Sequence, residues 1–494
     1  MIKQSHDIKN VIVLGGGTAG LVSALILKRS NPHLKIKVLE SSELGIIGVG
    51  EGSTEHWKDF MEFCNLDIGE MFRETDATYK VGIRFENWNG DGKYYYHSVA
   101  SPWDGVFVNQ VPSSYTYGIV NGLDPVSVVP KNFDNSVFPP EGLPVNQFHF
   151  DTFKLNKWLH KKCIANMITF EDAIIKDVIL DDESGYVRQL KADDGRTFDG
   201  DFFIDASGFN KVIIGKLGAK WHDQKKYLPM NHAIAFPTEG EENINGWTKS
   251  TAMSAGWMWK IPTYERYGNG YVFCDDYITK EQAVAEAEQA LGKSIEIGRD
   301  IKFSAGYTDT PMVKNCVAMG LSGIFVEPLE ASSIGATIQQ SFCLSFMLHS
   351  YIEGSDVMQN RYNATMLDMF KNIVDYIQLH YMTKRDDSQF WKDKPFELTD
   401  FNKETIETFK KTLPNRYFFE KAYYMFRQHN WTLIMYGIDL LDRDSIRRMW
   451  MNQPEYARKD VDAGVSRLNY LSDNTVFVSH REALNGFRNQ IKIR

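Results

Sequence analysis

Cysteine is scarce in this chain of 494 residues and shows no pairing pattern. The five cysteines are Cys64, Cys163, Cys274, Cys316 and Cys343. An odd number of widely spaced cysteines without a CxxC pair indicates neither a disulfide framework nor a metal site of the zinc type. We therefore expect buried thiols in a protein of the reducing cytoplasm.

Long hydrophobic runs and blocks of like charge are also missing. The first ten residues are mostly polar, and the apolar run Val11–Leu14 is far too short for a signal peptide or a membrane span. Acidic and basic residues are interspersed, with a formal net charge of -9, so we expect neither a nucleic-acid partner nor a membrane partner. The length and the hydrophobic share of 43% suit the core of a large enzyme.

A glycine-rich turn follows the first predicted strand and precedes a predicted helix at Leu21–Lys28. The turn matches GxGxxG through Gly15, Gly17 and Gly20, with Thr18 and Ala19 between the last two glycines. These glycines permit a tight turn and close approach to a pyrophosphate, and the helix start offers free N–H groups. The sequence predicts a Rossmann-like α/β fold that binds a dinucleotide.

A second predicted strand, Lys35–Leu39, ends in Glu40, which is placed to accept a hydrogen bond from a ribose hydroxyl. A purely structural turn would leave this acid unexplained. A later strand and turn at residues 202–208 include Asp205 and Gly208 and look like the second cofactor motif of flavin monooxygenases. FAD is therefore favoured over NAD, although a generic strand end stays open for this segment.

Two tryptophans at alternate positions, Trp257 and Trp259, precede Ile261 and Pro262. In an extended strand, residues i and i+2 project to one side, so the two indoles would form a double aromatic wall. An ordinary core strand is the alternative. Between the nucleotide motifs, Gly48, Val49, Gly50 and Glu51 belong to a glycine-rich loop that can approach a ring system closely.

These motifs together resemble those of the tryptophan-halogenase-like family of flavin-dependent halogenases, some viral members of which are similar in character. Residues 257–262 match the family's WxWxIP, and the loop at 48–52 is similar to its GVGEA. The segment Phe325–Glu330 matches FVEPLE, with Leu321 before it and Ile334 after it at the matching spacing. Residues 375–381 and 385–391 resemble the family's later helix and RDDSxFW element.

The resemblance implies a flavin-monooxygenase-type FAD-binding core over residues 1–340, including an interleaved substrate-facing sheet. It also implies a mainly helical region over 341–494 that packs on the core and caps the substrate. Candidate helices there are Phe342–Ile352, Ala364–His380, Lys403–Lys411 and Tyr417–Phe426. The aromatic residues between 417 and 431 suit either substrate stacking or a helical core, and we favour the core. His149 is expected in a structural turn before a helix at Thr152–His160.

The resemblance also implies the chemistry. In the family, FADH2, O2 and halide yield hypohalous acid, and a lysine that Lys80 matches receives it as a haloamine or by a hydrogen bond. Trp257 and Trp259 would keep the substrate off the flavin. Glu330 matches the family's active-site glutamate, which polarises the oxidant or accepts the substrate's proton; the alternative is a carboxylate at a helix N-terminus.

The halide loop departs from the family pattern. The family has Ser-Thr-Gly where this chain has Ala331, Ser332 and Ser333, so the last two are the inferred halide-binding positions. A lost glycine changes backbone freedom and pocket volume. The changed shape suggests a preference for bromide or iodide over chloride.

The sequence thus predicts a two-component halogenase that acts on an electron-rich aromatic substrate such as an indole or phenol, with FADH2 from a separate flavin reductase. No residues match those by which tryptophan-specific members clamp the amino acid. A flavin-dependent aromatic hydroxylase and a non-catalytic flavin-binding protein are the alternatives. Whether the protein forms a homo-oligomer stays open.

Overall fold

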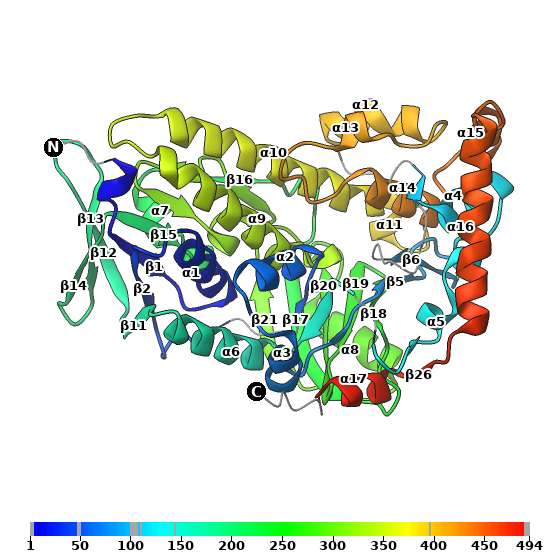
Figure 1. Ribbon diagram of the computed structural model, residues 1–494, viewed down its shortest axis with the longest axis horizontal. Helices are drawn as coiled ribbons and strands as arrows, with labels where there is room; N and C mark the ends of the chain where they lie inside the picture. The colour runs from blue at the N-terminus through cyan, green and yellow to red at the C-terminus, as the bar shows by residue number, and fades with distance from the viewer. Residues whose placement is uncertain are drawn as a thin grey trace.

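The computed structural model describes residues 4–46, 51–98, 107–108, 111–142, 145–394 and 397–488. The predicted loop residues Gly48, Val49 and Gly50 lie outside the described residues. Two large sheets and a set of C-terminal helices form the main layers of the molecule, and several smaller sheets lie beside them (Figure 1).

A six-stranded, mostly parallel sheet forms the nucleotide-binding part, in the order β11-β2-β1-β15-β24-β23. Its strands are β1 (Asn10–Leu14), β2 (Lys35–Glu40), β11 (Thr169–Asp172), β15 (Phe202–Asp205), β23 (Met312–Val313) and β24 (Cys316–Ala318). Only β23 pairs antiparallel. Because β1 is covered on both faces, four of its five residues are buried. The predicted Rossmann-like fold is confirmed.

Several helices come between the strands of this sheet in the sequence. They are α1 (Thr18–Ser30), α2 (His56–Phe63), α3 (Ile68–Thr75), α6 (Thr152–Ala165) and α7 (Val212–Lys216). Three short strands, β3 (Glu51–Gly52), β10 (Phe148–Phe150) and β4 (Thr78–Tyr79), form a small sheet in the order β3-β10-β4. His149 therefore lies in a strand, and its predicted place in a turn is wrong, because its backbone completes the ladder between its neighbours.

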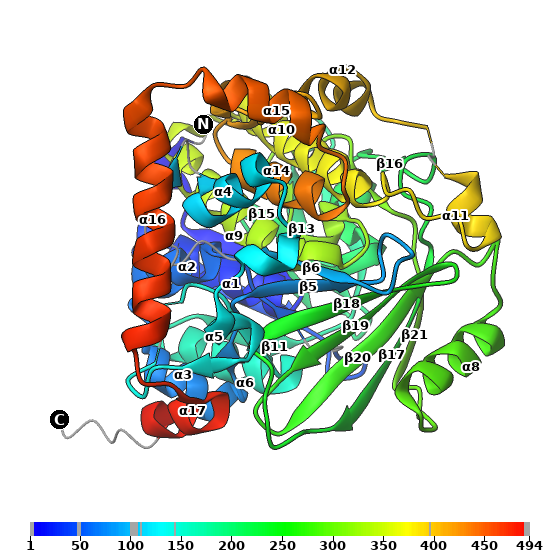
Figure 2. The same cartoon turned by 90° about the vertical axis from the view of Figure 1, so that its right-hand side faces the viewer.

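A seven-stranded sheet is the second layer, in the order β21-β17-β20-β19-β18-β5-β6 (Figure 2). Its strands are β5 (Gly82–Glu86), β6 (Tyr94–Ser98), β17 (His232–Glu239), β18 (Trp247–Met253), β19 (Gly256–Pro262), β20 (Arg266–Phe273) and β21 (Arg299–Lys302). The two tryptophans lie on β19, in the extended conformation expected for them.

The C-terminal part is mainly helical. Its longer helices are α9 (Ser332–Met347), α10 (Val357–His380), α12 (Asp400–Phe409), α14 (Gln428–Gly437), α15 (Arg443–Met451), α16 (Glu455–Asn474) and α17 (His480–Arg488). Helix α9 packs on α1, and α14 packs on β6. The expected boundary between 340 and 341 falls inside α9, so the helical part continues directly from the core.

Some elements differ from those expected. The predicted helix at Tyr417–Phe426 is wrong beyond its first turn, because only α13 (Arg416–Phe419) is helical there. In the aromatic group around it, Phe419 and Trp431 are buried, whereas Tyr417 is 86% exposed, so only part of the group belongs to the core. All five cysteines are buried and free. Among the described residues, no helix is long and apolar enough to cross a membrane.

Candidate active site

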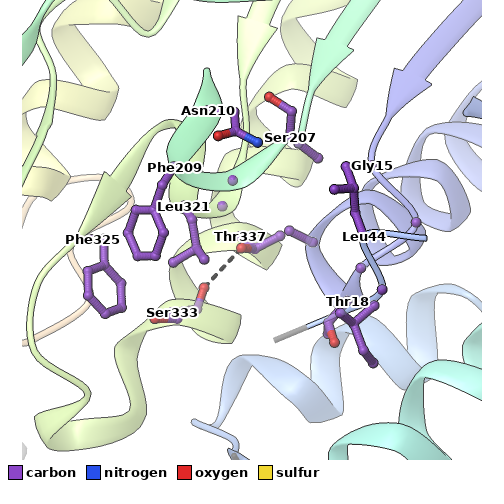
Figure 3. A pocket seen from close by; sticks show the side chains of 18 of the residues that line it. Gly15, Thr18, Leu44, Ser207, Phe209, Asn210, Leu321, Phe325, Ser333 and Thr337 are labelled. Atoms are coloured by element: carbon purple, nitrogen blue, oxygen red, sulfur yellow. Dashed lines mark hydrogen bonds between the residues drawn. The ribbon is translucent and has the colours of Figure 1, made fainter. Parts of the chain in front are cut away.

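A cavity of about 670 Å³ lies between the glycine turn after β1 and strand β19 (Figure 3). Phe209 and Phe325 face it from one side, and Gly15 and Thr18 lie on the other. The predicted cofactor residues that line it are Gly15, Gly17, Thr18, Ala19, Glu40, Gly208, Leu321 and Ile334. The cavity has the size of a cofactor site, which typically spans about 300–1,000 Å³.

The glycine turn fits a dinucleotide. Gly15 has a φ of +123°, and a Cβ atom there would lie 2.2 Å from the carbonyl oxygen of Ala206. A Cβ atom at Gly20 would lie 2.0 Å from the carbonyl oxygen of Gly15, so Gly20 lets the helix approach the turn and does not itself line the cavity. The free N–H groups at the start of α1 are the expected pyrophosphate donors.

Glu40 ends β2 beside this turn. Its Oε1 atom accepts a hydrogen bond from Nε2 of His160 at 3.1 Å. Its Oε2 atom lies against Gly16, where a Cβ atom would approach to 2.1 Å. The carboxylate lines the cavity at the end of a central strand, which is the position that suits a ribose hydroxyl.

Asp205 has a different place from the one expected. It is fully buried, does not line the cavity, and accepts hydrogen bonds from the backbone N–H groups of Ile213 and Ile214 at 2.7 and 2.8 Å. It also accepts from Ser207. The carboxylate holds the start of α7, and the following turn with Gly208 is what faces the cavity.

The two tryptophans lie side by side on β19, with ring centroids 6.0 Å apart. Only Trp259 lines the cavity, and its buried Nε1 atom has no hydrogen-bond partner among the described residues. Room for this indole comes from Gly270, where a Cβ atom would lie 2.1 Å from the ring. Trp257 instead donates to Oε2 of Glu327 at 3.2 Å.

Glu327 is an unexpected buried carboxyl group. It is 1% exposed and accepts a second hydrogen bond, from the hydroxyl of Tyr381 at 2.7 Å. Burial raises its pKa to about 7, against the effect of these two hydrogen bonds.

Lys80 is buried just beyond the cavity wall. Its Nζ atom donates to the carbonyl oxygen of Ser53 at 2.8 Å. A Cβ atom at Gly52, which lines the cavity, would lie only 3.5 Å from this Nζ atom. Burial lowers the pKa of Lys80 to about 8, although the charges of Glu330 and Glu55 act to raise it.

Glu330 lies at a bend before α9, with a φ of +68° that is unusual for a residue other than glycine. Its carboxylate is held by two imidazoles: Oε2 lies 2.6 Å from Nδ1 of His97, and Oε1 lies 2.8 Å from Nε2 of His380. Burial acts to raise the pKa of Glu330, but the two histidines hold it well below its usual range. The side chain binds these rings and does not cap the helix.

The inferred halide positions begin α9. Ser332 and Ser333 occupy its first two positions, and the preceding Ala331 has a φ of +53° and makes no side-chain cap. Ser333 lines the cavity, and Ser332 does not. Uncapped N–H groups at a helix start favour an anion, so the local geometry is compatible with halide.

Several residues of this region were not predicted as functional. His97 and Asn430 stand outside the recognised motifs, and His380 belongs to the matched segment 375–381 without an assigned role. The ionisable groups of Glu55 and His429 lie inside the protein, and each residue as a whole is partly exposed. Burial lowers the pKa of His429 to about 4, so this imidazole is neutral at neutral pH. The available signal for His97 was its place directly after three consecutive tyrosines, residues 94–96.

Fold and cavity together define an FAD-binding enzyme of the flavin-monooxygenase type, and comparisons with known proteins specify it. The family model described as tryptophan halogenase matches residues 10–452. The chain belongs to this family and is a flavin-dependent halogenase.

Named relatives support this assignment over most of the chain. Tryptophan 6-halogenase ThaL of Streptomyces albogriseolus is 30% identical over 451 residues, with 83% of each chain covered. Tryptophan 7-halogenase RebH of Lentzea aerocolonigenes is 28% identical, with 82% of each covered. The solved structure of BrvH, a flavin-dependent halogenase from Brevundimonas sp. BAL3, is 28% identical and has a TM-score of 0.84, covering 97% of this chain and 99% of that one.

Proposed function

We propose that this halogenase uses FADH2, O2 and a halide to place a halogen on an electron-rich aromatic carbon of an indole or phenol. Bound in the cavity, the reduced cofactor supplies with O2 the oxidising equivalent that turns halide into hypohalous acid. A separate flavin reductase supplies FADH2, since the sequence offers one nucleotide-binding motif. Glu40 and the glycine turn hold the cofactor, and the backbone at Ser332 and Ser333 holds the halide.

The position of Lys80 carries this proposal. Its ammonium group lies just behind Gly52, at the wall of the flavin cavity, and it is enclosed by protein. Such a group can capture an oxidant that leaves the flavin and present it to a substrate that never meets the flavin. The indole of Trp259 stands on the cavity side and would block direct contact between the two.

The substrate is proposed as a class. ThaL and RebH act, by their names, on tryptophan. This chain lacks a recognisable clamp for the ammonium and carboxylate of an amino acid, so the proposal covers small indoles and phenols, including substituted ones.

Mass spectrometry tests the proposal directly. The enzyme is incubated with FAD, NADH and a flavin reductase, with chloride, bromide or iodide, and with a panel of indoles, phenols and anilines. We expect products in which one halogen replaces one hydrogen, abolished in Lys80→Ala and retained in Lys459→Ala, which removes an exposed lysine of α16. Oxygen-only products independent of halide would overturn the proposal in favour of a hydroxylase, and bound FAD without any product would favour a non-catalytic protein.

A further inference from the structure

The carboxylate of Glu330 is enclosed between two histidines that come from distant parts of the chain. His97 lies on β6, and His380 is the last residue of α10. Their exposed fractions are 9% and 0%, and that of Glu330 is 4%. Because all three side chains are withdrawn from water, their hydrogen-bond partners determine where the protons are.

His380 faces an acceptor at each ring nitrogen. Nε2 lies 2.8 Å from Oε1 of Glu330, and Nδ1 lies 3.0 Å from the backbone carbonyl oxygen of Tyr376. A carbonyl oxygen can only accept, and so can the carboxylate of Glu330, which its lowered pKa keeps ionised, so both nitrogens donate. An imidazole that donates from both nitrogens carries two protons and a positive charge.

His97 has a different arrangement. Its Nδ1 atom faces Oε2 of Glu330, but its Nε2 atom faces Nδ2 of Asn430 at 2.9 Å. The orientation of this amide is fixed, because Oδ1 of Asn430 accepts from the backbone N–H of Arg427 at 2.7 Å. Nδ2 therefore donates to Nε2, which must be unprotonated, and His97 is neutral with its proton on Nδ1.

Aromatic side chains enclose His380. The rings of Phe85, Trp88 and Tyr376 lie around it, with centroids 5.2, 6.1 and 5.0 Å from that of the imidazole. The left-handed backbone of Glu330 is strained for a residue other than glycine, and such strain is typical of functional sites.

We propose that His380 is a charged positioning residue, which with neutral His97 fixes Glu330 as an anion near Lys80 and prevents it from acting as the proton acceptor of the reaction. Both oxygens of Glu330 already accept a strong hydrogen bond, which stabilises the ionised carboxylate and makes it a weak base. The proton arrangement follows from this geometry together with the lowered pKa of Glu330, whereas its consequence for turnover rests on the proposed function.

Other ionisable groups face this cluster from several elements. They are Lys80 after β4, Glu55 before α2, Tyr95 on β6, Tyr376 on α10 and His429 on α14. The charge of His380 compensates that of Glu330, which limits how far Glu330 can raise the pKa of Lys80. Loss of the His380 charge is therefore expected to raise the pKa of Lys80.

The proton positions can be measured without turnover. In protein labelled with 15N at its 12 histidines, heteronuclear NMR at pH 7.5 should show His380 with both nitrogens protonated and His97 with a proton on Nδ1 only. The signals are assigned by their loss in His380→Gln and His97→Gln. An unprotonated nitrogen in His380 would overturn the inference even if the enzyme proves to be an active halogenase.

The effect on turnover is tested with His380→Gln, which can keep a donor to Glu330 but has no charge. We expect kcat to fall by about tenfold or more, an unchanged KM for FADH2, and a pH–rate profile displaced to higher pH. His33→Gln, at an exposed position after α1, is the matched control and should behave as the wild type. Wild-type kcat and an unshifted profile in His380→Gln would contradict the positioning role.

Discussion

The flavin cavity and the cluster around Lys80 and Glu330 lie close together but are built in opposite ways. The cavity is a hollow made by a glycine turn, helix starts and mostly apolar side chains. The cluster is filled, and nearly every group in it is a charged or hydrogen-bonding side chain satisfied by another. A backbone-made site needs a chain that can bend, whereas a side-chain network depends on the identity of each member.

The largest expected effects separate the two regions. Gly15→Ala places a Cβ atom 2.2 Å from the Ala206 carbonyl at a positive φ, so FAD affinity should fall by about a hundredfold or more. Lys80→Ala should reduce halogenation at least as strongly but leave FAD affinity unchanged. Flavin fluorescence titration and product analysis on both variants measure this. A loss of FAD binding in Lys80→Ala would show that the cavity and the cluster do not act as separate sites.

Two glutamates give a sharper form of the same comparison. Glu330→Gln removes the anion between the histidines and should lower kcat by about a hundredfold, with FAD affinity retained. Glu40→Gln should weaken FAD binding by about tenfold, with kcat recovered at saturating flavin. Steady-state kinetics at several flavin concentrations distinguishes the two outcomes. If both variants lost kcat equally at saturating flavin, the proposed separation of cofactor binding from turnover would be contradicted.

Sequence motifs predicted the cavity well because local backbone requirements leave a local pattern. Gly15, Gly17, Glu40 and Trp259 line the cavity, whereas Gly20 packs on the turn and Trp257 donates to Glu327. The carboxylate of Asp205 was expected at the cofactor, yet the structure turns it toward α7. A strand end looks the same in sequence whichever way its last side chain points.

The cluster was only half predictable for a different reason. Lys80 and Glu330 were found through motifs, but the groups around Glu330 come from β6, α10 and α14. Of these, His97 and Asn430 are 333 residues apart in the sequence. No periodicity connects residues so far apart. Only the packing of α14 on β6 and of α10 on α9 brings them together.

A stability measurement extends the comparison to Glu327, the hydrogen-bond partner of Trp257. The pKa of Glu327 is raised by burial from 4.5 to about 7, so the folded state disfavours its ionised form. The free energy of unfolding should therefore fall as pH rises from about 4.5 to 7, by on the order of 3 kcal/mol. Glu327→Gln, which can still accept from Trp257 and Tyr381, should lose most of this dependence. Denaturant unfolding of both proteins at pH 5 and pH 8 tests this prediction. An equal change in the free energy of unfolding between the two pH values in wild type and variant would contradict the assignment.

The smallest expected effect concerns the wall between the two regions. Gly52 pairs with His149 in an ordinary extended strand, and a Cβ atom there would meet Lys80 Nζ, Ala331 Cβ and the His149 ring at 3.5 to 3.7 Å, which is normal contact. Gly52→Ala should therefore fold normally and retain FAD binding while narrowing the space between cavity and lysine. We expect turnover with iodide and bromide to fall a few-fold relative to chloride, measured by competition between halides in one reaction. Because the narrowing acts on size, a uniform loss across the three halides would mean that the oxidant reaches Lys80 by another path.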